Sequence, residues 1–169
     1  MAFVDTHSEL AEASRLYNLL GLEFSAPVPE TENAEYGACV FHVGGRSVRF
    51  RIGKVTPAKV GLFVAVWQRA SDGSPEPFAS EDAVDLLVIA VREHRHSGQF
   101  VFPKRALIEH GIVSVGGRGG KRGFRVYPPW SATANKQAGR SQSWQCDYFL
   151  DLGEAREVDL DRALRLYTS

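Results

Sequence analysis

The stretch ACVFHVGGRSVRFRIGKVTPAKVGLFVAVW, residues 38–67, alternates apolar and polar side chains on both sides of a double glycine. Alternation with a period of two is typical of β-strands, and a Gly-Gly pair between two such runs is typical of a tight hairpin. The pattern therefore predicts a hairpin with strands over residues 38–43 and 48–52 that turns at Gly44 and Gly45.

The same alternation places basic side chains on one face of the second strand. Val48, Phe50 and Ile52 share the inward parity, so Arg49 and Arg51 point to the opposite face, about 7 Å apart along the strand. No acid occurs in residues 50–70, so nothing nearby in the sequence neutralises them. We expect a strand face that is basic and solvated.

Two breaks follow this strand. Gly53 favours a bend, and the pair at residues 56–57, Thr-Pro, ends the run. Residues 62–67 are almost continuously apolar, which is typical of a strand buried on both faces. We therefore expect a buried strand over residues 62–67.

The rest of the chain mixes helical and strand patterns. A capping box at Thr6 and Glu9 predicts a helix that ends at Gly21, and Asp159 predicts the start of a last helix. Residues 82–91 suit a helix or a strand, of which we favour the strand after a capped turn at Ser80. Further expected elements are strands at 99–102, 112–115 and 124–127, a short helix at 103–110, and a helix over 134–149 whose aromatic end also suits a strand. We expect a single α+β domain over residues 1–169, a mixed, mostly antiparallel sheet flanked by helices, with helices near both ends.

Charge is unevenly distributed, although the formal net charge is zero. Residues 46–140 hold sixteen Lys and Arg but seven Asp and Glu, whereas residues 1–45 hold one cation and seven acids. Such asymmetry indicates either an anionic partner for the basic middle segment or acidic ends that fold back onto it. The sequence leaves both readings open.

Targeting and metal-binding patterns are absent from the sequence. There is no signal-peptide pattern and no apolar run near the ~20 residues needed to cross a bilayer. Cys39 and Cys146 lack the spacing of a metal site, and none of the five histidines forms a metal pair at i, i+4 with a carboxylate partner. We expect a reduced, cytoplasmic protein with no membrane segment, no metal site and no disulfide; its oligomeric state stays open.

A glycine-rich loop, VGGRGGKRGFRVYPPW at residues 115–130, carries Arg118 and Lys121 between glycines. Successive glycine N–H groups can surround an anion, and the cations would attract a phosphate. The loop lacks the spacing of a nucleotide-binding P-loop, because Val115 replaces a glycine and Arg122 replaces the hydroxyl residue. The alternative interpretation is a hairpin tip kept soluble by its charge.

Several blocks resemble the MepB family in order and content. They are FR-x-x-K-x-TP-x-K-x-G-x-FV-x-x-W from Phe50, GQF-x-FPK from Gly98 and R-x-YPPW from Arg125, within a resemblance that runs from Asn33 to Phe149. The resemblance implies an α/β fold and a cytoplasmic protein without a settled biochemical activity. It also implies a likeness to nucleic-acid-binding or nuclease-like proteins.

Our leading functional hypothesis is a domain that binds nucleic acid or another polyanion through a basic sheet face, without a cofactor. Cations on this face would neutralise phosphates, and an aromatic ring beside them would stack on bases. The candidate binding residues are Arg49, Arg51, Lys54, Lys59, Lys104, Arg118, Lys121, Arg125 and Trp130.

Three alternatives stay open. The first is a metal-dependent nuclease of PD-(D/E)xK type, in which Glu35 and Lys54 are weak catalytic candidates and Mg²⁺ is required; Ile52 stands where the second acid belongs. The second is a small anionic ligand site. The third is a protein-interaction role, or a basic strip that pairs internally with acids of the chain. The residues of the small-ligand site would be Trp67, Gln99, Phe102, Arg125, Tyr127 and Trp130.

Overall fold

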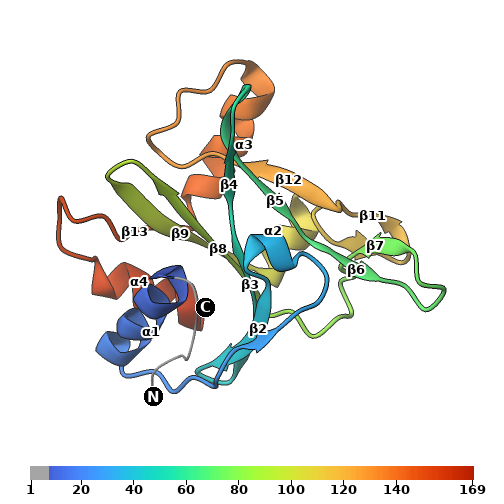
Figure 1. The fold of residues 1–169 in the computed structure, drawn as a ribbon, viewed down its shortest axis with the longest axis horizontal. Helices are drawn as coiled ribbons and strands as arrows, with labels where there is room; N and C mark the ends of the chain where they lie inside the picture. Colours follow the sequence, from blue (N-terminus) through green and yellow to red (C-terminus); the bar gives the residue numbers. More distant parts are fainter. Residues whose placement is uncertain (1–7) are drawn as a thin grey trace.

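A six-stranded mixed sheet forms the centre of the structure (Figure 1). The structure is a computed structural model, and it describes residues 8–169. The spatial order of the strands in this sheet is β1-β2-β3-β8-β9-β13. β3 and β8 are parallel, and the other neighbours are antiparallel. The strands are β1 (Val28–Pro29), β2 (Cys39–Val43), β3 (Arg46–Ile52), β8 (Leu86–Glu93), β9 (His96–Pro103) and β13 (Phe149–Asp151).

The predicted hairpin is confirmed as β2 and β3, with Val43 paired to Arg46. Gly44 and Gly45 lie between the strands with φ of 53° and 82°, in the left-handed region that glycine adopts without a steric cost. The predicted break at Gly53 and the strand at β8 are also confirmed. The double glycine therefore sets the register that aligns the alternating residues of both strands.

Two terminal helices cover one face of the central sheet. α1 (Ser8–Leu20) and α4 (Leu160–Thr168) lie side by side there in Figure 1. Gly21 follows α1 with φ of 69°, and the Asp159 carboxylate caps α4 by accepting a hydrogen bond from Arg162 N at 3.0 Å, as the sequence predicts. Thr6 of the predicted capping box lies outside the described residues.

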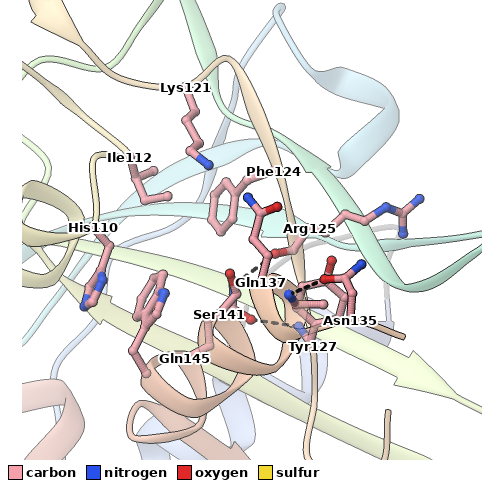
Figure 2. Close-up of a pocket in the computed structure, with 12 residues that line it drawn as sticks. His110, Ile112, Lys121, Phe124, Arg125, Tyr127, Asn135, Gln137, Ser141 and Gln145 are labelled. Carbon is pink, nitrogen blue, oxygen red and sulfur yellow. Dashed lines mark hydrogen bonds between the residues drawn. The ribbon is translucent and has the colours of Figure 1, made fainter. Parts of the chain in front are cut away.

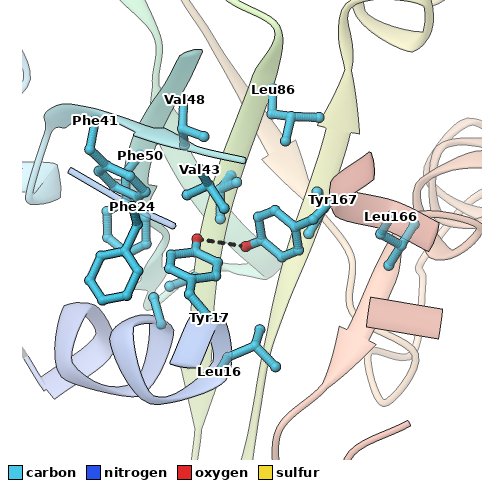
Figure 3. Close-up of a cluster of buried hydrophobic side chains, with 14 of the residues drawn as sticks. Leu16, Tyr17, Phe24, Phe41, Val43, Val48, Phe50, Leu86, Leu166 and Tyr167 are labelled. Atoms are coloured by element: carbon cyan, nitrogen blue, oxygen red, sulfur yellow. Dashed lines mark hydrogen bonds between the residues drawn. The ribbon is translucent and has the colours of Figure 1, made fainter. Parts of the chain in front are cut away.

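These helices and the sheet enclose the first core cluster (Figure 3). Tyr17 of α1 and Tyr167 of α4 meet inside it, and their hydroxyls form the hydrogen bond drawn in the figure. The main buried members of the first core cluster are Leu10, Ala13, Leu16, Tyr17, Phe24, Phe41, Val43, Val48, Phe50, Leu86, Val88, Leu166 and Tyr167.

A second, three-stranded sheet covers the opposite face. It has the order β12-β5-β4, and it encloses the second core cluster together with the central sheet. The strands are β4 (Lys54–Thr56), β5 (Lys59–Ala65) and β12 (Gly123–Val126). The main members of the second core cluster are Leu62, Val64, Phe78, Leu87, Ile89, Phe100, Phe102, Phe124, Val126 and Phe149.

The buried strand expected over residues 62–67 is β5, which begins earlier, at Lys59, and ends earlier, at Ala65. β5 ends at Ala65, where it pairs with Gly123, and Trp67 starts β6 (Trp67–Arg69), which pairs with β7 (Pro75–Pro77). The expected single strand is therefore divided, because the chain changes its pairing partner from β12 to β7 at Val66. The glycine-rich loop forms a small hairpin of its own, β10 (Ser114–Val115) and β11 (Arg118–Gly119).

Three further helical elements complete the described part of the fold. η1 (Ala34–Tyr36) precedes β2, and α2 (Lys104–Glu109) follows β9 as predicted. α3 (Lys136–Cys146) ends before β13, so the ambiguous segment is a helix followed by a strand. Neither Cys39 nor Cys146 forms a disulfide within residues 8–169. Within residues 8–169, no helix has the length and apolar character that a bilayer crossing requires.

Candidate anion-binding groove

Arg49 and Arg51 have the predicted parity, but their face of the strand is not solvated. The second sheet and its loops cover it, so Arg51 is fully buried. Glu30 bridges the two side chains, pairing with Arg49 Nη1 through one carboxylate oxygen and with Arg51 Nη1 through the other. The expectation of a free basic face is wrong at these two positions, because an acid 19 and 21 residues away in the chain reaches them.

Lys54 and Arg125 lie on the outer face of the second sheet. Lys54 and Arg125 each pair with Phe63 of the central strand β5, so the three side chains form one row across the sheet. The Lys54 ammonium lies 4.8 Å from the centre of the Tyr36 ring. This face therefore combines cations with aromatic rings.

Hydrogen bonds hold the Arg125 guanidinium against the β4–β5 hairpin. It donates to Val60 O at 3.2 Å, to Gly61 O at 3.3 Å and to the Thr56 hydroxyl. Lys59 is exposed at the turn of the same hairpin. The structure thus brings Lys54, Lys59 and Arg125 to one region.

The other predicted binding residues lie elsewhere or have structural partners. Lys104 donates to Asp82 O at 2.7 Å. Trp130 stacks on His96 with ring centres 4.7 Å apart and donates to Glu93 Oε1 at 3.0 Å. Arg118 is exposed on the β10–β11 hairpin. The extended patch of nine residues that the sequence suggests is therefore divided.

A groove of about 330 Å³ lies between α3, β12 and the segment that follows α2 (Figure 2). We call it the acid-free groove, because none of its lining residues is a carboxylate. Three other surface pockets of the described chain each include at least one Asp or Glu. The lining residues are His110, Ile112, Lys121, Phe124, Arg125, Tyr127, Asn135, Gln137, Ala138, Ser141, Trp144 and Gln145.

Lys121 supplies the ammonium group of the groove. In Figure 2 its side chain extends toward Phe124, whereas the Arg125 guanidinium turns away from the groove, toward the β4–β5 hairpin. Lys121 N donates to Ile112 O at 2.9 Å, which fixes the backbone there. Gly120 precedes it with φ of 84°, and a Cβ at this position would lie 2.6 Å from Pro77 Cβ. Only glycine allows the loop to approach this closely and direct Lys121 to the groove.

The N-terminal end of α3 adds partial positive charge. Asn135 caps the helix by accepting a hydrogen bond from Ala138 N at 2.9 Å, and no acid occurs in the first turn. Free backbone N–H groups and the helix dipole favour an anion at such an end. This end of α3 and Lys121 border the same groove, so both favour negative charge in it.

Aromatic and amide groups form the remaining wall. His110 and Trp144 stack with ring centres 3.9 Å apart and planes at 4°. The Gln145 amide joins α3 to β12, because its Oε1 accepts from Tyr127 N at 2.8 Å and its Nε2 donates to Arg125 O at 3.0 Å. The wall is therefore held by specific contacts at both the ring stack and the strand.

Sequence reasoning included Lys121, Arg125 and Tyr127 but did not single out His110, Gln137 or Gln145. The spacing of residues 137, 141, 144 and 145 is i, i+4, i+7 and i+8, which places them on one helix face. That spacing is the signal from which this wall could have been found. Nothing in the sequence connects His110 to it.

Comparisons with known proteins agree on one family. The model of the MepB-like family matches residues 30–151. The crystal structure of MepB is similar to the chain with a TM-score of 0.75 and 34% identity, covering 85% of this chain and 96% of that one. Comparison with curated proteins finds no match. The match over residues 30–151 and the likeness in structure show that the chain belongs to the MepB-like family.

Proposed function

We propose that the chain binds single-stranded nucleic acid, with one nucleotide in the acid-free groove. The observation that carries this proposal is the lining of the groove, which combines Lys121, aromatic rings and amides without a carboxylate. Phosphates need cations, and unpaired bases stack on aromatic side chains. A groove of about 330 Å³ suits one nucleotide unit better than a duplex.

Arg125 connects the groove to further cations that a longer nucleic acid strand would contact. The backbone of Arg125 borders the groove, while its guanidinium lies on the outer face of the second sheet, in the same row as Lys54. A nucleic acid strand that leaves the groove would therefore contact Arg125 first, and then Lys54 and Lys59 on the β4–β5 hairpin. Membership of the MepB-like family is compatible with this proposal but says nothing of the ligand.

The test is fluorescence anisotropy with labelled single-stranded DNA, single-stranded RNA and duplex DNA at two salt concentrations. We expect salt-sensitive binding of single strands, weakened about tenfold, equal to about 1.4 kcal/mol, by Lys121→Glu. Arg165→Glu is the matched control, because Arg165 is an exposed cation of α4 on the other side of the central sheet. Equal losses in both variants, or tighter binding of duplex, would contradict the proposal.

A small anionic ligand is the second candidate, because the groove volume also fits a compact ligand. It is favoured if no oligonucleotide binds at low salt while a mononucleotide raises the melting temperature. The groove residues in that case are those of the acid-free groove, and not Trp67 or Trp130, which do not line it.

We do not propose the nuclease alternative. Ile52 is half-buried against the first core cluster, at the position where a metal-binding acid is required. Glu35 is exposed in η1, and residues 8–169 contain no group of three potential metal ligands. The Lys54 ammonium lies over the Tyr36 ring, 4.8 Å from its centre.

A further inference from the structure

Two guanidinium groups share a single carboxylate between the two sheets. Arg49 and Arg51 belong to β3, which lies between β2 and β8 in the central sheet, and Glu30 bridges them. Among residues 8–169, Glu30 is the acid that forms an ion pair with either arginine. We call these three residues the twin-arginine site. It encloses one more positive charge than negative charge.

Hydrogen-bonding capacity is also left over at this site. Arg51 donates through Nε to Ala65 O at 3.1 Å and through Nη1 to Phe50 O at 2.9 Å, in addition to Glu30. Arg51 Nη2 and Arg49 Nε are buried and have no partner within residues 8–169. Buried N–H groups of a cation are costly when unpaired, so two donors remain for further acceptor atoms.

The electrostatic surroundings agree with an excess of positive charge. Burial lowers the pKa of the Arg51 guanidinium, although the Glu30 carboxylate opposes this effect, and the neighbouring Arg49 lowers it further. The ring of Phe78 lies 5.2 Å from the Arg49 guanidinium carbon and 5.6 Å from that of Arg51. An aromatic face compensates a cation only in part. One carboxylate and one ring thus leave the pair incompletely neutralised.

The bridging acid lies beside a short strand at the edge of the central sheet. Glu30 directly follows β1, a strand of two residues that, within residues 8–169, is the edge of the central sheet and pairs with β2. Val28 is 65% exposed, and Glu30 N donates to Ala38 O at 2.9 Å. Glu30 and Arg49 are 14% and 23% exposed, so the site is reached from solvent at this edge. Moving Glu30 outward therefore exposes little apolar surface.

We propose that Arg49 and Arg51 bind a phosphate dianion, either inorganic phosphate or a phosphate monoester, and that Glu30 occupies this site until the phosphate displaces it. A phosphate with a charge of about −1.5 to −2 matches two guanidinium groups, which the single charge of Glu30 does not. Its oxygens also match the fork of arginine donors, including the two that lack partners. A phosphodiester, with one charge, gains no such match. The site is therefore distinct from the acid-free groove, where a nucleic acid backbone is expected.

The test is isothermal titration calorimetry with inorganic phosphate, monomethyl phosphate and dimethyl phosphate at constant ionic strength. Glu30→Gln removes the competing charge, so we expect it to lower the Kd for inorganic phosphate about tenfold, and Glu30→Gln/Arg49→Gln to abolish binding. Glu32→Gln is the matched control, because Glu32 pairs with the exposed Arg69 instead. Monomethyl phosphate is expected to bind at least about tenfold tighter than dimethyl phosphate, from their difference in charge.

The proposal is overturned if Glu30→Gln and Glu32→Gln change the Kd equally, or if mono- and diesters bind alike. Glu30→Asp, which withdraws the carboxylate by one methylene, replaces Glu30→Gln if that variant does not fold, with the same expected direction. Lys121→Glu should leave phosphate binding unchanged, which separates this site from the acid-free groove. A 5′-phosphorylated oligonucleotide that competes with inorganic phosphate, when its 5′-hydroxyl counterpart does not, would identify a nucleic acid end as the phosphate source.

Discussion

The Tyr17 hydroxyl donates a hydrogen bond of 2.9 Å to the Tyr167 hydroxyl, although the two residues are 150 positions apart in the chain. Tyr167 in turn donates to Gln99 Oε1 at 2.6 Å. All three residues are buried, and they belong to α1, α4 and β9. This polar chain inside the first core cluster therefore joins both terminal helices to the central sheet.

Removing the central hydroxyl of that chain should destabilise the protein. Tyr167→Phe leaves Gln99 Oε1 buried without its donor, and a buried unsatisfied group costs about 1–3 kcal/mol. We expect a loss of this size in the free energy of unfolding, measured by urea denaturation. Tyr148→Phe is the control, since Tyr148 is only half-buried and is not part of this polar chain, so removal of its hydroxyl should be nearly neutral. Equal losses in the two variants would show that the polar chain contributes little.

Alkaline pH should weaken the fold through the same two tyrosines. Burial raises the pKa of both the Tyr17 and the Tyr167 hydroxyl above the ordinary value, so the folded state keeps protons that the unfolded state releases near pH 10. Their contribution to stability is complete below pH 10 and is lost as the pH rises above it. Two such protons correspond to a slope of up to about 2.7 kcal/mol per pH unit.

Urea denaturation between pH 9 and pH 11.5 measures this slope, and absorbance at 295 nm reports tyrosine ionisation. The variant Tyr17→Phe/Tyr167→Phe should be less stable at pH 8 but should show a flatter decline above pH 10. A slope that the double substitution does not change would mean that other groups cause the alkaline unfolding.

Two glycines should respond to alanine in opposite directions. A Cβ at Gly98 in β9 would lie 2.5 Å from Leu150 O and would overlap the Phe149 ring, so Gly98→Ala should separate β9 from β13 at a cost of about 1–3 kcal/mol. Gly139 lies inside α3, where a Cβ would meet only Thr133 Oγ1 at 3.6 Å. Gly139→Ala should therefore stabilise the protein by about 0.5–1 kcal/mol. Thermal unfolding of the two variants checks both predictions: Gly98→Ala should lower the melting temperature, and Gly139→Ala should raise it.

The salt dependence of binding gives a count of phosphate contacts in the proposed nucleic acid site. Each neutralised phosphate of a single strand contributes about 0.7 to the slope of log Kd against log salt. Lys121→Ala should reduce the slope by about 0.7, and Lys54→Ala should do the same if the strand continues over the second sheet. Arg165→Ala should leave the slope unchanged. A loss of affinity in Lys121→Ala with an unchanged slope would show that its ammonium does not meet a phosphate.

Local patterns predicted the elements of the fold well. The alternation and the double glycine fixed β2 and β3, and the Gly21 and Asp159 signals located the ends of two helices. These predictions succeeded because hydrophobic period, caps and turns depend on residues that are close in the sequence. The division of residues 62–69 into two strands was missed, because it follows from a change of partner and not from local composition.

The candidate sites depend on contacts that are distant in the chain, so the sequence predicted them poorly. Arg51 was expected on a solvated face, since its partner Glu30 lies in a loop whose position the alternation of β3 does not reveal. His110 stacks on Trp144 across 34 positions, and no spacing rule connects them. Lys121 was selected from the glycine-rich loop and Arg125 from the strand that follows it. Only the tertiary structure assigns Lys121 to the groove and the Arg125 guanidinium to the β4–β5 hairpin.

The pairing of Tyr17 with Tyr167 also has a consequence for synthesis on the ribosome. At a translation rate of roughly 5–20 residues per second, α1 precedes its partner helix by about 8 to 30 seconds, since 150 positions separate the two tyrosines. During that interval the apolar side of α1 has no α4 to pack against, and it is accessible to ribosome-associated chaperones or to other nascent chains. Slowing or stalling translation before α4 should therefore increase aggregation and capture by chaperones more than a stall after it.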